Sequence, residues 1–429
     1  MGCLRLLLAT SLAVAGALPS WSWDTIQNYV HCANTTGEWN AGALATLASK
    51  PFVVFEKNHK LTQAPVSDDA EGKIAASCAE VKKLSPTTDC YMYVESDVAR
   101  SFYGLGHWVE ANKATAALKC NGSYVTQTWS EEGLEFTFYA YDFRDATMQA
   151  KWVARVADAV QAGAVDGAFI DGDRNGFWSS VTNGCAKDEQ DAWAAGLNAS
   201  VAALAATIGP DKTRIPASRV CAMFRDDGEI YRLISNYPTT SALALCQGGM
   251  LERGGSMLDV DAWNAAKTCA GGPCLLDFHA QNAQQSLRNF NSSLANFLIG
   301  VHEHGYFGVG GGWSGAGESA CDTWLYQYPE YSKSLGAPKS DFTVAKGSHG
   351  LNCTLLDDKP SHKDVSGCLF RRVFASGTKV FLGQYAAPAF GADADDAVGA
   401  LLGTSNYGAC VFWSDGTTTG NTTLCPRAE

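Results

Sequence analysis

Residues 165–173 read VDGAFIDGD, and this stretch decides the fold that we predict for the chain. It contains a short apolar strand, 168–170, that ends at Asp171. Before it, apolar side chains within 151–161 recur at helical spacing, which predicts a helix. A helix, a glycine-containing turn and a buried strand that ends in a carboxylate are typical of an α/β barrel. Because such barrels carry catalytic residues at the carboxyl ends of their strands, Asp171 is our first catalytic candidate.

Two other interpretations of Asp171 remain open. An aspartate before glycine is common in turns, because its short side chain can bond nearby backbone groups. Alternatively, the first positions of a calcium-binding loop are matched by Asp171, Asp173, Asn175 and Gly176. The last ligand position of such a loop would be Thr182 instead of glutamate, and a strand precedes the loop where a helix is expected. We therefore predict no metal site.

Eight predicted strands alternate with helices along most of the chain. They cover residues 52–55, 90–94, 135–141, 168–170, 213–217, 242–252, 274–278 and 305–309. Alternation of this kind predicts a parallel sheet, and eight units predict closure into a (β/α)8 TIM barrel over residues 18–345. The apolar stretch 26–30 is left out of this count. If it belongs to the barrel, one later strand must drop out.

From residue 346 the pattern changes to that of paired strands. Residues 369–374 and 379–382 flank a Ser376-Gly377 turn and predict a hairpin, and 409–413 predicts another strand. We expect residues 346–429 to form a small antiparallel β appendage that packs on the barrel.

The first 17 residues have the features of a secretory signal peptide. A basic residue, Arg5, precedes an apolar run from 6 to 15 that is too short to span a bilayer, and Ala15-Gly16-Ala17 provides a small-residue cleavage site. No later segment is apolar enough to span a membrane. We therefore predict a secreted protein that is not anchored in a membrane.

The cysteines and glycosylation sequons agree with export. Of 15 cysteines, Cys3 leaves with the signal peptide, and the remaining 14 allow up to seven disulfides. Close pairs that would form loop clips are Cys269 with Cys274, Cys353 with Cys368, and Cys410 with Cys425. N-linked glycans are expected at the sequons of Asn34, Asn121, Asn198, Asn291, Asn352 and Asn421.

Charge and motifs exclude several functional classes. The formal net charge is −12, and the sequence has no basic run, which argues against nucleic acid or an anionic membrane as partner. The sequence has no pair of CxxC motifs for zinc, no Gly-x-Ser-x-Gly elbow, no phosphate loop and no dinucleotide fingerprint. We predict that the protein needs no cofactor.

Polar residues follow many of the predicted strands. Five carboxylates and one imidazole stand at strand ends: Glu56, Glu95, Asp142, Asp171, Glu252 and His279. Buried carboxylates without partners are costly, so packing does not explain this set. Two carboxylates that face each other across a barrel mouth suit glycoside hydrolysis, in which one attacks or activates water and the other donates a proton. Asp171 and Glu252 each stand where a predicted strand leaves the barrel, and both are candidates for this pair.

The remaining candidates are predicted to bind substrate. Besides Glu56, Glu95, Asp142 and His279 they include Asp173 and four aromatic residues able to stack on a sugar ring, Tyr93, Tyr141, Trp178 and Trp313. Other roles stay open: Glu252 beside Arg253 and Glu56 beside Lys57 could form ion pairs, Asp142 could cap a helix, and the aromatic rings could pack in the core.

Several segments resemble a known family. They are 23–57, with YVHCAN at 29–34 and VFEK at 54–57, then DGAFID at 166–171, GMLE at 249–252, YPEYSKSLGAP at 328–338 and RRVFASG at 371–377. These segments are similar to secreted glycoside-hydrolase-like TIM-barrel proteins related to the endo-α-1,4-polygalactosaminidase and α-galactosidase superfamily. The resemblance implies that Asp171 is the nucleophile and Glu252 the acid/base.

The sequence thus predicts a secreted glycoside hydrolase that cleaves O-glycosidic bonds of an oligo- or polysaccharide. A carbohydrate-binding protein on an inactive hydrolase scaffold is the alternative, because a fold does not fix an activity. A polysaccharide lyase is a third possibility.

Overall fold

The structure is a computed structural model of the chain. It describes residues 20–63, 69–131, 133–171, 182, 184–208, 214–216, 249–252, 274–277, 283–311, 319–345, 368–384 and 408–420.

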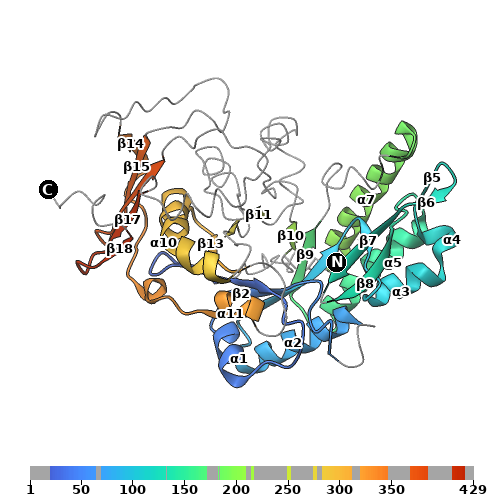
Figure 1. The fold of residues 1–429 in the computed structure, drawn as a ribbon, viewed down its shortest axis with the longest axis horizontal. Helices are drawn as coiled ribbons and strands as arrows, with labels where there is room; N and C mark the ends of the chain where they lie inside the picture. Colours follow the sequence, from blue (N-terminus) through green and yellow to red (C-terminus); the bar gives the residue numbers. More distant parts are fainter. Residues whose placement is uncertain are drawn as a thin grey trace, which may run out of the picture.

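Eight parallel strands in the described chain form the barrel (Figure 1). Five pair in the order β1-β2-β3-β9-β10 and three in the order β11-β12-β13. A parallel bridge between Asn28, just before β1, and Phe307 of β13 joins the two sheets on one side, and β10 contacts β11 on the other. The predicted (β/α)8 fold is confirmed. The strands are β1 (Val30–Cys32), β2 (Phe52–Phe55), β3 (Asp89–Glu95), β9 (Gly167–Asp171), β10 (Arg214–Pro216), β11 (Gly249–Glu252), β12 (Cys274–Asp277) and β13 (Gly305–Gly308).

Helices connect these strands and cover the sheet. They are α1 (Ala41–Ala48), α2 (Ala70–Leu84), α5 (Ala146–Gln161), α7 (Lys187–Ile208), α10 (Ala283–Gly300) and α11 (Ser319–Leu325). Asp145 caps α5 as predicted, because its carboxylate accepts the backbone N–H of Met148 at 2.9 Å. On its inner face α5 buries apolar side chains that include Trp152 and Val156. The helix therefore turns its apolar face toward the barrel.

An insertion between β3 and α5 corrects the predicted strand count. It consists of β4 (Val98–Ala99), α3 (Gly104–Ala111), α4 (Lys113–Ala116), β5 (Lys119–Cys120), β6 (Ser123–Tyr124), β7 (Thr126–Glu131) and β8 (Leu134–Ala140). Strand β8, which we expected in the barrel, pairs antiparallel with β4 and β7 instead. Its place in the barrel is taken by β1, which overlaps the apolar stretch that we had left out of the count.

The C-terminal strands form an antiparallel sheet against α10 (Figure 1). The order is β14 (Thr343–Ala345), β15 (Cys368–Val373), β16 (Lys379–Gln384), β17 (Gly408–Phe412) and β18 (Thr418–Gly420). The sheet therefore begins with β14, before the residue at which we expected the appendage to start. Pro329–Ser332 forms a short 3-10 helix on the way to it.

A single arginine connects this sheet to the end of α10. The buried Arg372 donates from Nη1 to the carbonyl oxygens of Leu298, Ile299 and Val301 at 3.3, 2.8 and 2.6 Å. The last carbonyls of a helix have no partner within the helix, so this contact satisfies groups that burial would otherwise leave costly. An apolar cluster that includes Phe297, Phe370 and Trp413 surrounds the contact.

Three disulfides join described cysteines: Cys32–Cys321, Cys78–Cys90 and Cys120–Cys185. Disulfides in this number are typical of proteins that fold in an oxidising compartment. Each of the three close pairs suggested by sequence has one member outside the described residues.

The sequons differ in exposure. Asn121, Asn198 and Asn291 are exposed, whereas Asn34 is completely buried and its Oδ1 accepts the backbone N–H groups of Thr36 and Gly37, each at 3.2 Å. A glycan on Asn34 would not fit this packing. Asn352 and Asn421 lie outside the described residues.

Candidate active site

The carboxyl ends of the parallel strands lie at one edge of the barrel. Glu95 at the end of β3 is the register partner of Asp171 at the end of β9. On the other side of β10, Glu252 at the end of β11 pairs with Asp277, and Asp277 pairs with Gly308 of β13. The backbone positions of the predicted pair, Asp171 and Glu252, therefore belong to strands separated only by β10.

Glu56, which follows β2, is held by two basic partners. Its Oε1 lies 2.8 Å from Nε2 of His31 on β1, and its Oε2 lies 3.0 Å from Nζ of Lys57. Burial by itself would raise the pKa of Glu56, but the charge of Lys57 and the contact with His31 outweigh it and lower the pKa to about 2. The carboxylate is thus ionised at neutral pH, and its ion pair with Lys57, left open by the sequence, is present.

Glu95 is buried with its two oxygens in different situations. Oε2 accepts from the Tyr93 hydroxyl at 3.1 Å and from Nε and Nη2 of Arg100 at 2.8 and 2.7 Å. Oε1 has no hydrogen-bond partner in the part of the chain that the structure describes. Burial lowers the pKa of the Arg100 guanidinium, but Glu95 and other acidic neighbours more than offset this, and the net shift is upward. Arg100 therefore stays charged and keeps one oxygen of Glu95 engaged.

Aromatic side chains of β1, β3 and β9 pack against one another next to these carboxylates. Tyr93 stacks on Phe169 of the neighbouring strand with ring centroids 5.9 Å apart, and the ring of His31 meets Phe169 edge-on at 4.6 Å. All three side chains are buried. Tyr93 therefore packs in the barrel and bonds Glu95 in this structure, and its ring is not an open stacking surface.

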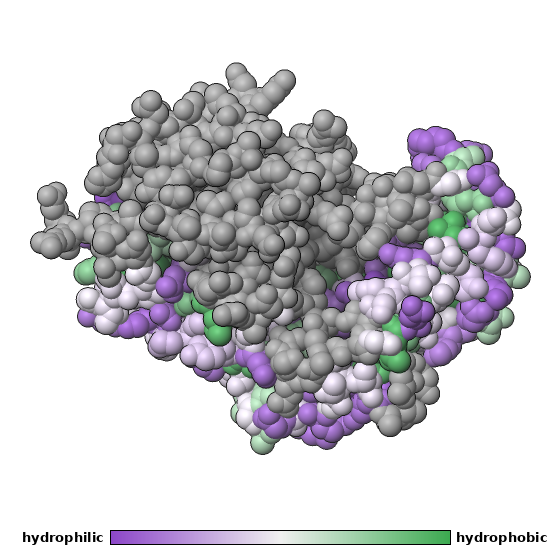
Figure 2. All heavy atoms as spheres, viewed as in Figure 1, coloured by the Kyte–Doolittle hydropathy of each residue, from purple (hydrophilic) through white to green (hydrophobic). Residues whose placement is uncertain are grey.

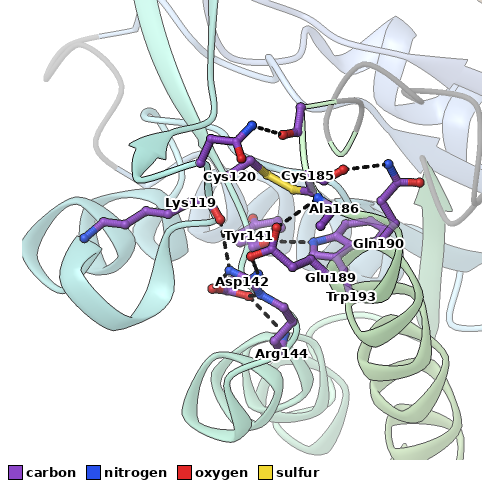
Figure 3. The surroundings of a disulfide bond; sticks show 12 residues. Lys119, Cys120, Tyr141, Asp142, Arg144, Cys185, Ala186, Glu189, Gln190 and Trp193 are labelled. Carbon is purple, nitrogen blue, oxygen red and sulfur yellow. Dashed lines mark hydrogen bonds and ion pairs between the residues drawn. A yellow bond between two sulfur atoms is a disulfide. The ribbon is translucent and has the colours of Figure 1, made fainter.

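Tyr141 and Asp142 follow β8 of the insertion and lie near the Cys120–Cys185 disulfide (Figure 3). Tyr141 is buried, and its carbonyl oxygen accepts from the Trp193 indole at 2.7 Å. Asp142 binds Arg144 through both oxygens, at 2.7 and 2.8 Å, and Arg144 also reaches Glu189 of α7 at 2.9 Å. The nearby Cys120–Cys185 disulfide ties the same region together. The position of Asp142 is thus explained by its ion pair, and it does not end a barrel strand.

Several predicted residues fall beyond the described part. Asp173, Trp178, His279 and Trp313 lie outside it, as does most of the possible calcium loop. For Asp171 and Glu252 the structure describes the backbone.

Two residues of this edge were not predicted from sequence. His31 stands in the apolar run around β1, where the sequence predicts only that a histidine is buried. Its role as a partner of Glu56 follows from the structure alone. Arg100 follows the short β4 and reaches back to Glu95. A basic residue shortly after a strand-end carboxylate was the available signal for Arg100.

Neither a metal-binding cluster nor a membrane-spanning helix occurs among the described residues. Among them, no three side chains of His, Cys, Asp or Glu come close enough to hold a metal ion. Within the same residues no helix has both the length and the apolar character needed to cross a bilayer. On the face drawn in Figure 2, hydrophobic residues of the coloured surface form small separate patches among hydrophilic ones.

Comparison with known proteins gives a family match and distant structural likenesses. The model of the family described as hypothetical glycosyl hydrolase family 15 matches residues 82–378. No curated protein matches the sequence. Among solved structures, the α-amylase of Geobacillus thermoleovorans complexed with acarbose has 10% identity and a TM-score of 0.44, over 85% of this chain and 87% of that one.

Two further structures show a similar level of likeness. The Aspergillus fumigatus protein Ega3 in complex with galactosamine has 8% identity and a TM-score of 0.32, over 62% of this chain and 81% of that one. The α-galactosidase of Geobacillus stearothermophilus in complex with stachyose has 9% identity and a TM-score of 0.41, over 86% of this chain and 48% of that one. The chain thus spans about half the length of that α-galactosidase.

Proposed function

Because the chain belongs to hypothetical glycosyl hydrolase family 15, we propose that it is a secreted glycoside hydrolase that cleaves O-glycosidic bonds of an oligo- or polysaccharide with Asp171 and Glu252. The observation that carries the proposal is the strand order, in which β9 and β11 end in these two carboxylates with only β10 between them. Export is supported by the three disulfides.

The expected spacing of the two strands suits this chemistry. Neighbouring strands lie about 4.8 Å apart, so the backbones of β9 and β11 are separated by roughly 10 Å. Two side chains that lean toward each other from that distance reach carboxyl separations of about 5 to 9.5 Å, which covers both retaining and inverting glycosidases. The separation of backbones is therefore compatible with either stereochemical course.

The two carboxylates have distinct roles in a retaining reaction. Asp171 attacks the anomeric carbon while Glu252 donates its proton to the departing glycosidic oxygen, so the C–O bond breaks as the glycosyl–Asp171 ester forms. Glu252, now ionised, then takes a proton from water, which attacks the anomeric carbon and releases Asp171. In an inverting reaction Asp171 would instead activate the water directly.

The described neighbours support this pair in two ways. Glu56 is ionised and held on both oxygens, so it suits a role in fixing His31 and Lys57 better than one as proton donor. Glu95 stands in register with Asp171 and has one oxygen bound by Arg100. Its Oε1 is also buried and has no hydrogen-bond partner among the described residues.

Incubation of the purified full-length protein with a panel of polysaccharides tests the proposal. New reducing ends without unsaturated sugars are expected, and unsaturated ends would indicate a lyase instead. Asp171→Asn and Glu252→Gln should each abolish cleavage while glycan binding is kept, and the matched variant Glu110→Gln, an exposed carboxylate paired with Lys113, should cleave normally. Full activity of both site variants would refute the assigned roles.

A second experiment separates the two carboxylates. The anomeric configuration of the first product, followed by NMR, distinguishes retention from inversion. In Asp171→Ala, added azide should restore turnover and yield a glycosyl azide, because a small anion can occupy the space of the missing nucleophile. Binding of a glycan without any cleavage by the wild-type protein would favour the inactive carbohydrate-binding scaffold.

A further inference from the structure

The hairpin β7–β8 brings a tryptophan to the carboxyl ends of β2 and β3. The guanidinium carbon of Arg100 lies 4.3 Å from the centroid of the Trp129 ring, and Nζ of Lys57 lies 5.6 Å from it. Lys57 follows Glu56 at the end of β2, and Arg100 binds the carboxylate of Glu95 at the end of β3. Trp129 therefore lies over the edge of the barrel where the candidate active site is located.

The side chains that contact Trp129 are also connected to one another, through Tyr93 and Glu95. Lys57 also lies over the ring of Tyr93, with Nζ 4.6 Å from the centroid, and the Tyr93 hydroxyl donates to Glu95. Glu95 holds Arg100, and Arg100 returns to Trp129. The indole is thus contacted by two cations, each of which is itself bound by a buried carboxylate.

Trp129 packs against the hydrophobic core, but packing alone does not explain its setting. Its side chain remains partly exposed, and two cations lie over its ring. Its contact with the ring of Phe138 is edge-on, with the ring centroids 6.3 Å apart. An indole in a folding core is normally enclosed by apolar groups. Here a large, flat, partly exposed aromatic surface lies beside the strand-end carboxylates Glu56 and Glu95 and their basic partners.

We propose that Trp129 is a sugar-stacking residue of this mouth, which receives the C–H face of a pyranose ring of the substrate on the side of β2 and β3. Rigid aromatic side chains bind such faces at little entropic cost, because the apolar ring is already ordered before the ligand arrives. The proposal rests on the proposed glycosidase function and extends it to substrate binding. Arg100 and Lys57 act as positioning residues that fix the plane of the indole.

The test measures binding and kinetics of Trp129 variants in the full-length protein. Trp129→Leu keeps an apolar side chain but removes the ring, and Trp129→Phe keeps a smaller ring. Trp108→Leu is the matched control, because Trp108 is also partly exposed and also has a lysine over its ring, Lys151 at 5.6 Å, but lies on α3 beside α5. Thermal unfolding of each variant shows whether it folds.

Binding is measured by calorimetry in the Asp171→Asn background with tetrasaccharides of glucose, galactose, N-acetylglucosamine and galactosamine. For the sugar that binds best, we expect Trp129→Leu to weaken the Kd at least about tenfold and Trp129→Phe less than about threefold, with Trp108→Leu unchanged. In protein with Asp171 intact, Trp129→Leu and Trp129→Phe should raise KM more than they lower kcat, and Trp108→Leu should change neither.

The outcomes separate this inference from the function on which it rests. Loss of binding in Trp129→Leu without any hydrolysis by the wild-type protein would support the stacking role and refute the hydrolase. Hydrolysis by a folded Trp129→Leu variant with an unchanged KM would overturn the stacking role and leave the hydrolase standing. Failure of the wild-type protein to bind any of the four sugars would overturn the stacking role as stated.

Discussion

The ion pairs of Glu56 predict a measurable dependence of stability on pH. The folded protein lowers the pKa of this buried carboxyl from its ordinary value of 4.5 to about 2. A carboxyl whose pKa is depressed on folding stabilises the folded state above its unfolded pKa, and this contribution is lost as the pH falls through the folded pKa. The contribution is on the order of 3 kcal/mol at pH 7 and falls to about 1.4 kcal/mol at pH 3.

Glu56→Gln should remove this contribution. We expect the variant to lose about 3 kcal/mol of unfolding free energy at pH 7, measured by guanidinium chloride denaturation, and about half of that or less at pH 3. The comparison variant Glu110→Gln should lose less than about 0.5 kcal/mol at either pH, because exposed ion pairs contribute little. A loss for Glu56→Gln that is the same at both pH values would refute the reasoning, since it would come from packing and not from charge.

Three further predictions follow from the fold. Arg372→Met should destabilise the protein by about 3 kcal/mol in denaturant, because it leaves the final carbonyls of α10 without their buried donor; a loss under 1 kcal/mol would contradict this. Replacing Cys120 and Cys185 together by Ser should cost about 3 kcal/mol and make the insertion more sensitive to limited proteolysis, because the bond closes a loop with a sequence separation of 65; unchanged cleavage would count against it. Glycopeptide mass spectrometry of the protein secreted from eukaryotic cells should find Asn34 unmodified, and a glycan there would disprove its burial, whereas modification is expected at exposed sequons, namely Asn121, Asn198 and Asn291.

The sequence predicted the parts of the barrel whose signals are local. Apolar runs such as 52–55 and the strand ending at Asp171 were identified because a buried parallel strand is continuously hydrophobic. The alternation of strands with long helices then sufficed for the (β/α)8 architecture. The apolar strand runs and their alternation with helices depend only on residues close together in the chain, so both can be predicted without coordinates.

The errors came from pairings between distant segments. Residues 134–140 have the alternating pattern of a strand, but that pattern does not tell whether the partner is β3 of the barrel or β7 of a hairpin. The same limit applies to the candidate site. The strand-end carboxylates could be identified from sequence, whereas the pairing of Glu56 with His31 on the neighbouring strand could not, because an ion pair across strands leaves no regular spacing in the chain.

The closure of the barrel constrains how the chain is assembled during synthesis. Cys32 on β1 and Cys321 on α11 are bonded across a sequence separation of 289, and a parallel bridge also joins Asn28 to Phe307 of β13. The first barrel strand therefore leaves the ribosome long before the strand that covers its free edge. Until Cys321 and β13 have been synthesised, Cys32 is a free thiol able to form mispaired disulfides. The edge of the sheet at β1 is likewise unpaired, and unpaired strand edges favour aggregation. Production of this protein should accordingly depend on chaperones and disulfide isomerases that protect the early half while the late half is made.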